Sequence, residues 1–319
     1  MISLEEVKVL HLEPTTLCNA GCPQCSRYLD DGSYNHLLPE SSIDVDFLSQ
    51  HLSPKFVAQL DKMFMCGTFG EPAAADALQI FSWFRSHSAN ITLGMNTNGS
   101  LRSPGWWRDL ANILNLSQDY VVFSIDGLED TNHIYRKNTI WKKIVDNSQA
   151  FIDAGGSAHW DMLIFDHNQH QVAQARELAK AMGFRWFRTK VTNRFDTRQI
   201  SWLKPVSLPS RRPSQYISCR TQVHKEIYLS AHGLVLPCCY IGEELYAPNV
   251  QQRRNNLLAA LGDPQDYKLS QDIKQTVNRF SQISDRWSNN SIDICQIKCG
   301  LVDGNSRSAA QWTSEEQLQ

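Results

Sequence analysis

Short apolar runs alternate with segments of helical periodicity through the first two thirds of the chain. Six runs of four to six residues are each followed by small or polar residues, at 7–12, 62–65, 91–95, 120–125, 159–164 and 185–190. This alternation is typical of βα units, in which helices cover the faces of a parallel sheet. The pattern predicts an α/β fold, a partial (βα)6 TIM-like barrel that stays partly open.

Helix signals punctuate the segments between these runs. Ser103 and Pro104 offer an N-cap and a proline at the first helical position, and Gly155 and Gly183 stand where glycine stops helices. In 140–152 the apolar residues fall on one face, as in an amphipathic helix. Residues 26–61 are long for a connection between a strand and the next helix, and we expect one or two short helices there.

The βα rhythm stops after Lys190, and a stretch rich in proline and arginine follows. Such a stretch is a plausible boundary between domains. The predicted parts are a barrel at 1–195, a linker at 196–215, a smaller domain at 216–304 and a flexible tail at 305–319.

The smaller domain has a pattern of its own. Two apolar runs flank Gly233 within 226–236, which predicts a β-hairpin with glycine at the position that needs a positive φ. Residues 251–287 are polar with helical character. We expect a small carboxy-terminal module that consists of a β-hairpin and helices.

Composition and charge narrow the class of protein. The 319 residues are 42% apolar, enough for a large domain plus a smaller one, and the formal net charge is −2. A chain without a basic field is not expected to bind nucleic acid or a membrane surface. The amino terminus lacks a signal-peptide pattern and no run of about 18 apolar residues occurs, which predicts a cytoplasmic protein.

Nine cysteines in a cytoplasmic chain indicate metal ligands or catalytic thiols rather than disulfides. Cys18, Cys22 and Cys25 lie together in a loop just after the first predicted strand. A closed structural zinc site takes four ligands, usually as two close pairs. An iron–sulfur cluster held by three cysteines keeps one iron open for a substrate or cofactor, and the triplet favours that arrangement.

Small and polar residues also follow the other predicted strands. In a parallel barrel the carboxyl ends of the strands face one mouth, where the loops after them build the site. The residues at these ends are Gly70, Glu71, Pro72, Asn98, Ser124, Asp126 and Asn168. We expect them to converge near the cysteine loop.

With these motifs the sequence resembles the radical S-adenosylmethionine (SAM) superfamily. The spacing Cys18-x3-Cys22-x2-Cys25 matches the cluster motif, Gly70-Glu71-Pro72 the second-strand motif, and Thr97-Asn98-Gly99 and Ser124-Ile125-Asp126-Gly127 the third and fourth strand-end motifs. The match covers about residues 7–190 in the correct order. The resemblance implies that the open iron of a [4Fe–4S] cluster chelates SAM. One electron then cleaves SAM to methionine and a 5′-deoxyadenosyl radical, which abstracts hydrogen from a substrate.

The resemblance also implies a role for each matching residue. Cys18, Cys22 and Cys25 would ligate the cluster. Gly70, Glu71 and Pro72 would lie at the methionyl amino group, Ser124 and Asp126 near the ribose, Asn98 in the same pocket, Arg136 near the SAM carboxylate and Asn168 towards the adenine. Two positions depart from the usual pattern: Gln24 replaces an aromatic residue and Phe69 replaces a glycine. Neither departure removes a ligand.

Later cysteines extend the resemblance to a second module. Cys219, Cys238, Cys295 and Cys299 resemble the ligands of the twitch domain, a shortened relative of the SPASM domain. That resemblance implies a second, auxiliary [4Fe–4S] cluster with four thiolate ligands. Zinc is the alternative, because a hairpin with paired cysteines is also typical of a zinc ribbon.

A few residues stay outside both sets. Cys66 is expected to be a small buried apolar residue. Cys239, next to Cys238, is either structural or an alternative ligand. The pair Arg211 and Arg212 is either a solvated part of the linker or a contact for an anionic substrate.

The function that follows from the resemblance is a radical SAM oxidoreductase, which receives its electron from a reductant such as flavodoxin or ferredoxin. Dehydrogenation or cross-linking of a small polar molecule is expected, because the chain begins almost at the first predicted strand and shows no segment for leader-peptide recognition. The alternative is a maturase that cross-links or epimerises a ribosomal peptide. A different class, a non-catalytic Fe–S electron carrier or a zinc-stabilised binding module, would not need Glu71, Asn98 and Asp126 at successive strand ends.

Overall fold

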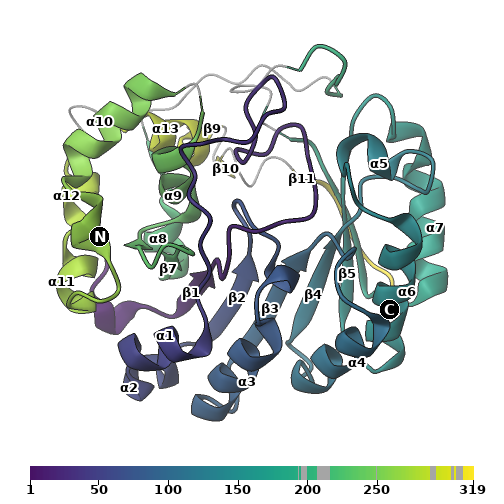
Figure 1. Ribbon diagram of the computed structural model, residues 1–319, viewed down its shortest axis with the longest axis horizontal. Helices are drawn as coiled ribbons and strands as arrows, with labels where there is room; N and C mark the ends of the chain where they lie inside the picture. The colour runs from purple at the N-terminus through teal and green to yellow at the C-terminus, as the bar shows by residue number, and fades with distance from the viewer. Residues whose placement is uncertain are drawn as a thin grey trace.

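The structure is a computed structural model that describes residues 1–192, 194, 200–206, 216–248, 250–287, 292–302, 305–306 and 312–319. Its centre is a nine-stranded sheet with the order β11-β6-β5-β4-β3-β2-β1-β7-β8, and β9 and β10 form a separate pair (Figure 1). The strands are β1 Val9–Leu12, β2 Lys62–Cys66, β3 Thr92–Thr97, β4 Tyr120–Ser124, β5 Ala158–Leu163, β6 Trp186–Lys190, β7 Glu226–Leu229, β8 Val235–Leu236, β9 Leu301–Val302, β10 Asn305–Ser306 and β11 Trp312–Gln317.

Strands β1 to β6 pair in parallel and in sequence order. Each agrees with its predicted run to within two residues at either end. The sheet does not close, because its order within the described residues ends at β11 on one side and at β8 on the other. The predicted fold class, a partial parallel barrel of the α/β type, is confirmed.

Helices connect the strands of the barrel, and further helices belong to the carboxy-terminal module. Their bounds are α1 Val45–His51, α2 Pro54–Ala58, α3 Ala77–His87, α4 Pro104–Ile113, α5 Asn132–Tyr135, α6 Trp141–Asp153, α7 Val172–Met182, α8 Arg220–His224, α9 Cys239–Tyr246, α10 Gln251–Leu261, α11 Ile273–Asn278, α12 Ser281–Ser284 and α13 Asp293–Cys299, with 3-10 turns η1 Leu4–Glu6, η2 Pro72–Ala74, η3 Gln169–Gln171 and η5 Pro264–Tyr267. The two short helices expected in 26–61 are α1 and α2. None of the described helices has the length and apolarity that a transmembrane segment needs.

The caps follow the sequence signals. The Ser103 hydroxyl accepts a hydrogen bond from the Trp106 N–H at the start of α4, and Gly183 ends α7 with a φ of +91°. Helices α3, α4, α6 and α7 lie along the outer side of the sheet (Figure 1). Trp107 of α4 is fully buried there, with its ring 5.2 Å from Phe123 of β4 and 6.4 Å from Phe151 of α6. Because strand side chains alternate between faces, the other set points to the inner face of the sheet.

The predicted hairpin is present and joins the main sheet. Strand β7 pairs in parallel with β1, from Val9 opposite Glu226 to Leu12 opposite Leu229, and β8 pairs antiparallel with β7. Gly233 makes the turn with a φ of +74°. A side chain there would be strained, because L-residues rarely adopt this conformation. The carboxy-terminal module therefore continues the sheet of the barrel, and of the predicted linker only 200–206 lies within the described residues.

The expectation of a flexible tail over 305–319 is wrong for its last part. Residues Trp312–Gln317 form β11, which pairs antiparallel with β6 from Trp312 opposite Lys190 to Gln317 opposite Trp186. Its side chains are polar except Trp312, so the segment lacks an apolar pattern. Backbone pairing to the open edge of β6 supplies the order that composition does not indicate.

We expect removal of 312–319 to lower the melting temperature, because β6 would lose its edge partner. A loss of about 1–3 kcal/mol in the free energy of unfolding is expected, measured by chemical denaturation. The exposed Glu315 provides a control, since Glu315→Ala alters β11 without removing its backbone. Equal stability of the truncated chain and the control would contradict the role of β11.

Candidate functional site

The three amino-terminal cysteines lie in a loop that follows β1. Cys22 is buried, whereas Cys18 and Cys25 are half-buried. The Cys18 sulfur accepts a hydrogen bond from the Ala20 N–H at 3.3 Å, and the Cys25 N–H donates to the Cys22 carbonyl at 3.0 Å. Arg27 holds the start of the loop by donating to the Cys18 carbonyl at 2.8 Å. The loop thus keeps its three thiols close together at the carboxyl end of the sheet.

Glu71 connects the end of β2 to the end of β3. Its carboxylate is buried and accepts hydrogen bonds from the Thr97 hydroxyl at 2.6 Å and the Asn98 N–H at 2.7 Å. Burial raises the pKa of this carboxyl group. The Asn98 side chain then donates to the Cys18 sulfur at 3.8 Å and to the Asn19 side chain at 2.9 Å. Three predicted site residues therefore form one chain of contacts, from Glu71 through Asn98 to Cys18.

The glycines of the second-strand motif are explained by close backbone contacts. A Cβ atom on Gly70 would lie 1.7 Å from the Thr15 carbonyl oxygen, and one on Gly67 would lie 1.5 Å from the Gly70 carbonyl oxygen. No side chain fits either position, so the motif can pack directly on the cysteine loop. Pro72 follows as the first residue of η2. Phe69, the departure from the usual motif, is buried with its ring 6.0 Å from Tyr246 of α9.

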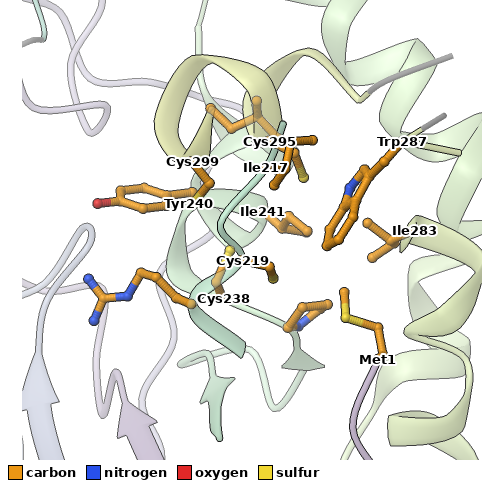
Figure 2. Close-up of a pocket in the computed structure, with 13 residues that line it drawn as sticks. Met1, Ile217, Cys219, Cys238, Tyr240, Ile241, Ile283, Trp287, Cys295 and Cys299 are labelled. Carbon is orange, nitrogen blue, oxygen red and sulfur yellow. The ribbon is translucent and has the colours of Figure 1, made fainter. Parts of the chain in front are cut away.

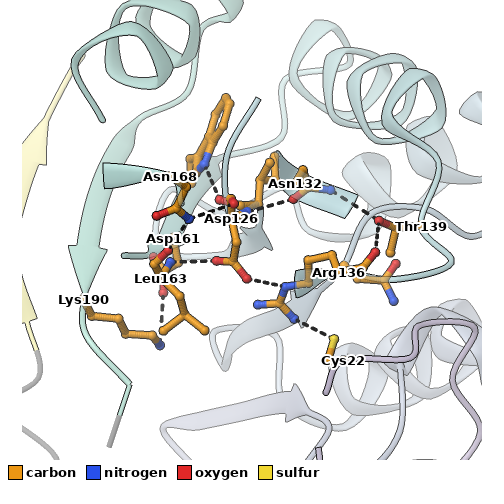
Figure 3. Close-up of polar contacts among 12 residues, drawn as sticks. Cys22, Asp126, Asn132, Arg136, Thr139, Asp161, Leu163, Asn168 and Lys190 are labelled. Carbon is orange, nitrogen blue, oxygen red and sulfur yellow. Dashed lines mark hydrogen bonds and ion pairs between the residues drawn. The ribbon is translucent and has the colours of Figure 1, made fainter. Parts of the chain in front are cut away.

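Asp126 and Arg136 form an ion pair beside the cysteine loop (Figure 3). The Arg136 Nε donates to Asp126 Oδ2 at 2.6 Å, and an Nη1–H donates to the Cys22 sulfur at 3.9 Å. Asp126 Oδ1 accepts from the Leu163 N–H at 2.7 Å, which ties the end of β4 to the end of β5. Burial raises the pKa of the Cys22 thiol, and the Arg136 charge opposes that rise. This arrangement brings a positive charge to a predicted cluster ligand.

Asn168 is buried and its amide is occupied by backbone groups. Its Nδ2 donates to the Asp126 and Leu163 carbonyls at 2.9 and 2.8 Å, and its Oδ1 accepts from the Phe165 N–H at 2.7 Å. It therefore supports the strand ends, and its approach to an adenine stays a prediction. Ser124 ends β4, opposite Asp161 of β5 in the register.

Glu13 is a site residue that the sequence reasoning missed. Its carboxylate is buried just after β1 and accepts hydrogen bonds from the Phe69 N–H at 2.6 Å and the Gly70 N–H at 3.1 Å. The Tyr228 hydroxyl of β7 donates to its other oxygen. Glu13 thus joins the barrel, the second-strand motif and the carboxy-terminal hairpin. The signal was available, since Glu13 is a polar residue at the end of a buried strand.

The four carboxy-terminal cysteines line one pocket (Figure 2). Cys219 and Cys238 directly precede α8 and α9, while Cys295 and Cys299, four residues apart, share one face of α13. The cavity between them is small, about 10 Å³. Its other walls are mainly apolar, formed by Met1, Ile217, Pro237, Ile241, Ile283, Trp287 and Ile294 together with Arg220 and Tyr240. The structure therefore brings together all four predicted ligands from three separate segments.

This donor set fits an iron–sulfur cluster, because soft thiolates in an apolar setting are the usual cluster ligands. Burial raises the pKa of Cys295 to about 12 and of Cys299 to about 11, so these thiols are neutral until a metal deprotonates them. Within the described residues, no three His, Cys, Asp or Glu side chains are arranged to hold a single metal ion. Cys239 is half-buried and does not line the pocket, and Cys66 is half-buried at the end of β2.

No protein-family model matches the sequence, and no curated protein matches it. Solved structures share its fold. SuiB from Streptococcus suis, bound to S-adenosylmethionine, superposes with a TM-score of 0.53 at 12% identity over 74% of this chain and 61% of SuiB. Native anSMEcpe with bound AdoMet and Cp18Cys peptide gives a TM-score of 0.54 at 13% identity over 92% of this chain and 88% of that protein. SuiB bound to its precursor peptide SuiA gives a TM-score of 0.51 at 11% identity over 73% of this chain and 59% of SuiB.

Both proteins were solved with S-adenosylmethionine bound, and this chain has their fold. The fold that the resemblance predicted is confirmed. The chain spans 61% of the length of SuiB. The twitch module, the second cluster and the role of each site residue stay predictions.

The Glu13 network generates a test of stability against pH. Burial raises the pKa of Glu13 from an ordinary value of 4.5 to about 7. The folded protein then binds more protons than the unfolded chain between these values, so Glu13 makes the free energy of unfolding fall as pH rises from 4.5 to 7. Glu13→Gln removes this contribution. The free energy of unfolding of wild type minus that of Glu13→Gln is therefore expected to fall as pH rises from 4.5 to 7.

Urea denaturation at several pH values measures this difference. Tyr228→Phe is the matched control, because it removes one hydrogen bond and leaves the carboxyl group in place. Loss of that bond is expected to cost about 1 kcal/mol. If the difference in free energy of unfolding between wild type and Glu13→Gln stays constant between pH 4.5 and 7, Glu13 does not have a raised pKa in the folded protein.

Proposed function

We propose that this chain is a radical SAM enzyme that binds a [4Fe–4S] cluster through Cys18, Cys22 and Cys25 and cleaves SAM reductively. The observation that carries this proposal is the convergence of three strand ends on the cysteine loop. Asn98 of the third strand end contacts Cys18, and Arg136, held by Asp126 of the fourth, contacts Cys22. An electron carrier needs none of these contacts.

The chain's own residues would position the reacting groups. When bound, the cluster and SAM supply a one-electron cleavage that gives methionine and a 5′-deoxyadenosyl radical, which abstracts hydrogen from the substrate. Glu71 is already occupied by Thr97 and Asn98, so it would orient Asn98 rather than contact the methionyl group through its carboxylate. Arg136 would offer its remaining N–H groups to the SAM carboxylate, a pairing that guanidinium groups favour.

A second [4Fe–4S] cluster is proposed on Cys219, Cys238, Cys295 and Cys299. Its support is the single pocket that these four thiols line. A cluster at this place would accept an electron from a substrate radical, which favours an oxidation such as dehydrogenation or cross-linking. Flavodoxin or ferredoxin would supply the first electron, and a cytoplasmic location would agree with that supply.

Two substrate classes stay in the proposal. One is a small polar molecule. A peptide is the alternative, and complexes of SuiB with SuiA and of anSMEcpe with Cp18Cys peptide give it specific support from proteins of the same fold. The superposition on anSMEcpe covers 92% of this chain and 88% of that protein, so a peptide substrate is worth direct testing.

The first test is SAM cleavage by anaerobically reconstituted protein with dithionite. Wild type is expected to release 5′-deoxyadenosine and methionine, and Cys22→Ala is expected to lose this activity, because the cluster loses a ligand. Arg136→Gln is expected to weaken SAM binding about tenfold, measured by equilibrium dialysis. Well-reconstituted wild type that forms no 5′-deoxyadenosine would sink the proposal.

The second test counts iron and sulfide. A double variant of Cys295→Ala and Cys299→Ala is expected to lose about four irons per chain, while Cys66→Ala keeps the wild-type content. Stoichiometric zinc in place of that iron would overturn the second cluster and favour a zinc-stabilised module. Because only iron content is compared, this result does not depend on SAM cleavage.

A further inference from the structure

The inner face of the sheet carries an excess of cationic side chains. Strand side chains there include Lys62 of β2 and Arg188 and Lys190 of β6, while α8 adds Arg220. Two carboxylates pair with them, Asp161 of β5 and Glu226 of β7. The set therefore holds four cations and two carboxylates. Arg220 also lines the pocket of the four carboxy-terminal cysteines, whereas neither candidate cofactor site uses Arg188, Lys190 or Asp161.

One of the two excess charges lies at the edge of the sheet next to β11. Asp161 is the partner of two cations, with Arg188 Nε at 2.7 Å and Lys190 Nζ at 3.9 Å. In the described part of the chain, no other carboxylate lies within ion-pair distance of either cation. The Asp161 side chain is 5% exposed, whereas Arg188 and Lys190 keep 20% and 30%. One carboxylate thus neutralises one charge and leaves the second cation available.

Trp312 forms an aromatic floor under both cations. The Arg188 guanidinium lies 4.9 Å from its ring centre and the Lys190 ammonium 4.8 Å. A guanidinium stacked on an aromatic ring keeps its edge free for hydrogen bonding. Arg188 donates to Asp161 through Nε, and the structure records no hydrogen bond from its two NH2 groups to any described residue. Hydrogen-bond donors that have no acceptor and lie beside an excess positive charge are suited to bind an anion.

The position of this group relates it to the candidate site. Asp161 and Lys190 lie in the same cluster of side chains as Asp126, Arg136 and Cys22 (Figure 3). The Lys190 charge also lowers the pKa of Cys66 at the end of β2, although burial raises that pKa overall to about 11. Lys190 therefore faces across the inner side of the sheet, towards the mouth where the cysteine loop lies.

We propose that Lys190 and Arg188, above Trp312, bind a carboxylate group of the substrate at the mouth of the barrel. This inference rests on the proposed function for the presence of a substrate there. It narrows the substrate class to molecules with a carboxylate, either a small acid or a peptide with an acidic side chain. A single carboxylate matches the one positive charge that Asp161 leaves uncompensated, whereas a phosphate dianion would exceed it.

The test measures the binding of small probes to reconstituted full-length protein without reductant. Ligand-observed NMR at constant ionic strength detects the binding. The small-molecule probes are glutarate and its neutral twin glutaramide. The peptide probes are acetyl-Gly-Glu-Gly-amide and acetyl-Gly-Gln-Gly-amide. We expect at least one carboxylate probe to bind more tightly than its neutral twin, and the arm that succeeds identifies the source of the carboxylate.

Variants locate the binding. Lys190→Gln is expected to weaken binding of the carboxylate probe about tenfold, and Lys190→Arg is expected to retain that binding. Lys142→Gln is the matched control, because Lys142 pairs with Asp146 on the exposed face of α6. Urea denaturation checks that Lys190→Gln folds like the control, since Arg188 still neutralises Asp161 in that variant.

Three results would overturn the inference. They are equal binding of charged and neutral probes, no binding by any probe, and an equal effect of Lys190→Gln and Lys142→Gln on binding. This binding test is independent of SAM cleavage. A protein that binds the carboxylate but forms no 5′-deoxyadenosine would support this site and contradict the proposed function. A protein that forms 5′-deoxyadenosine but does not bind the carboxylate would support the proposed function and contradict this site.

Discussion

The buried carboxylate of Glu71 is the constraint on which the candidate site depends. A carboxylate removed from water must find hydrogen-bond donors, and Glu71 finds them in Thr97 and Asn98 at the next strand end. That requirement fixes the Asn98 side chain against the Cys18 sulfur. The segment that leads into this loop can approach only because Gly70 leaves no side chain against the Thr15 carbonyl, and Gly67 lets the motif turn tightly on Gly70. A motif first interpreted as a cofactor contact is thus also the support that aligns the cysteine loop.

Local patterns predicted the barrel well, because each βα unit is a short segment with its own periodicity. The pairing partners of β7 and β11 were not predictable in this way. Glu13 and Tyr228 are 215 residues apart in sequence, and no local pattern indicates that β7 pairs with β1. Strand β11 is polar, so its order comes from the backbone of β6 rather than from apolar side chains.

The site divides similarly into predictable and unpredictable parts. Cysteine spacing and strand-end residues predicted which side chains lie near one another, because that depends on residue type and order, and their role as ligands stays a prediction. Which polar groups are already occupied depends on tertiary contacts. Asn168, for example, uses its amide on three backbone groups, and Asp126 divides its oxygens between Leu163 and Arg136. Sequence indicated that these residues belong together but not which atoms remain for a cofactor.

The parallel pairing of β7 with β1 also bears on how the protein is made. Val9 and its neighbours leave the ribosome early, while their partners Glu226–Leu229 are synthesised only after the rest of the barrel. During that interval the edge of β1 has no strand on that side, and an unpaired edge invites association with other chains. Contacts between such distant segments also slow folding. Synthesis of the complete hairpin is therefore the step that closes this edge and joins Cys219 and Cys238 to the body that holds the first three cysteines, while Cys295 and Cys299 follow later in the chain.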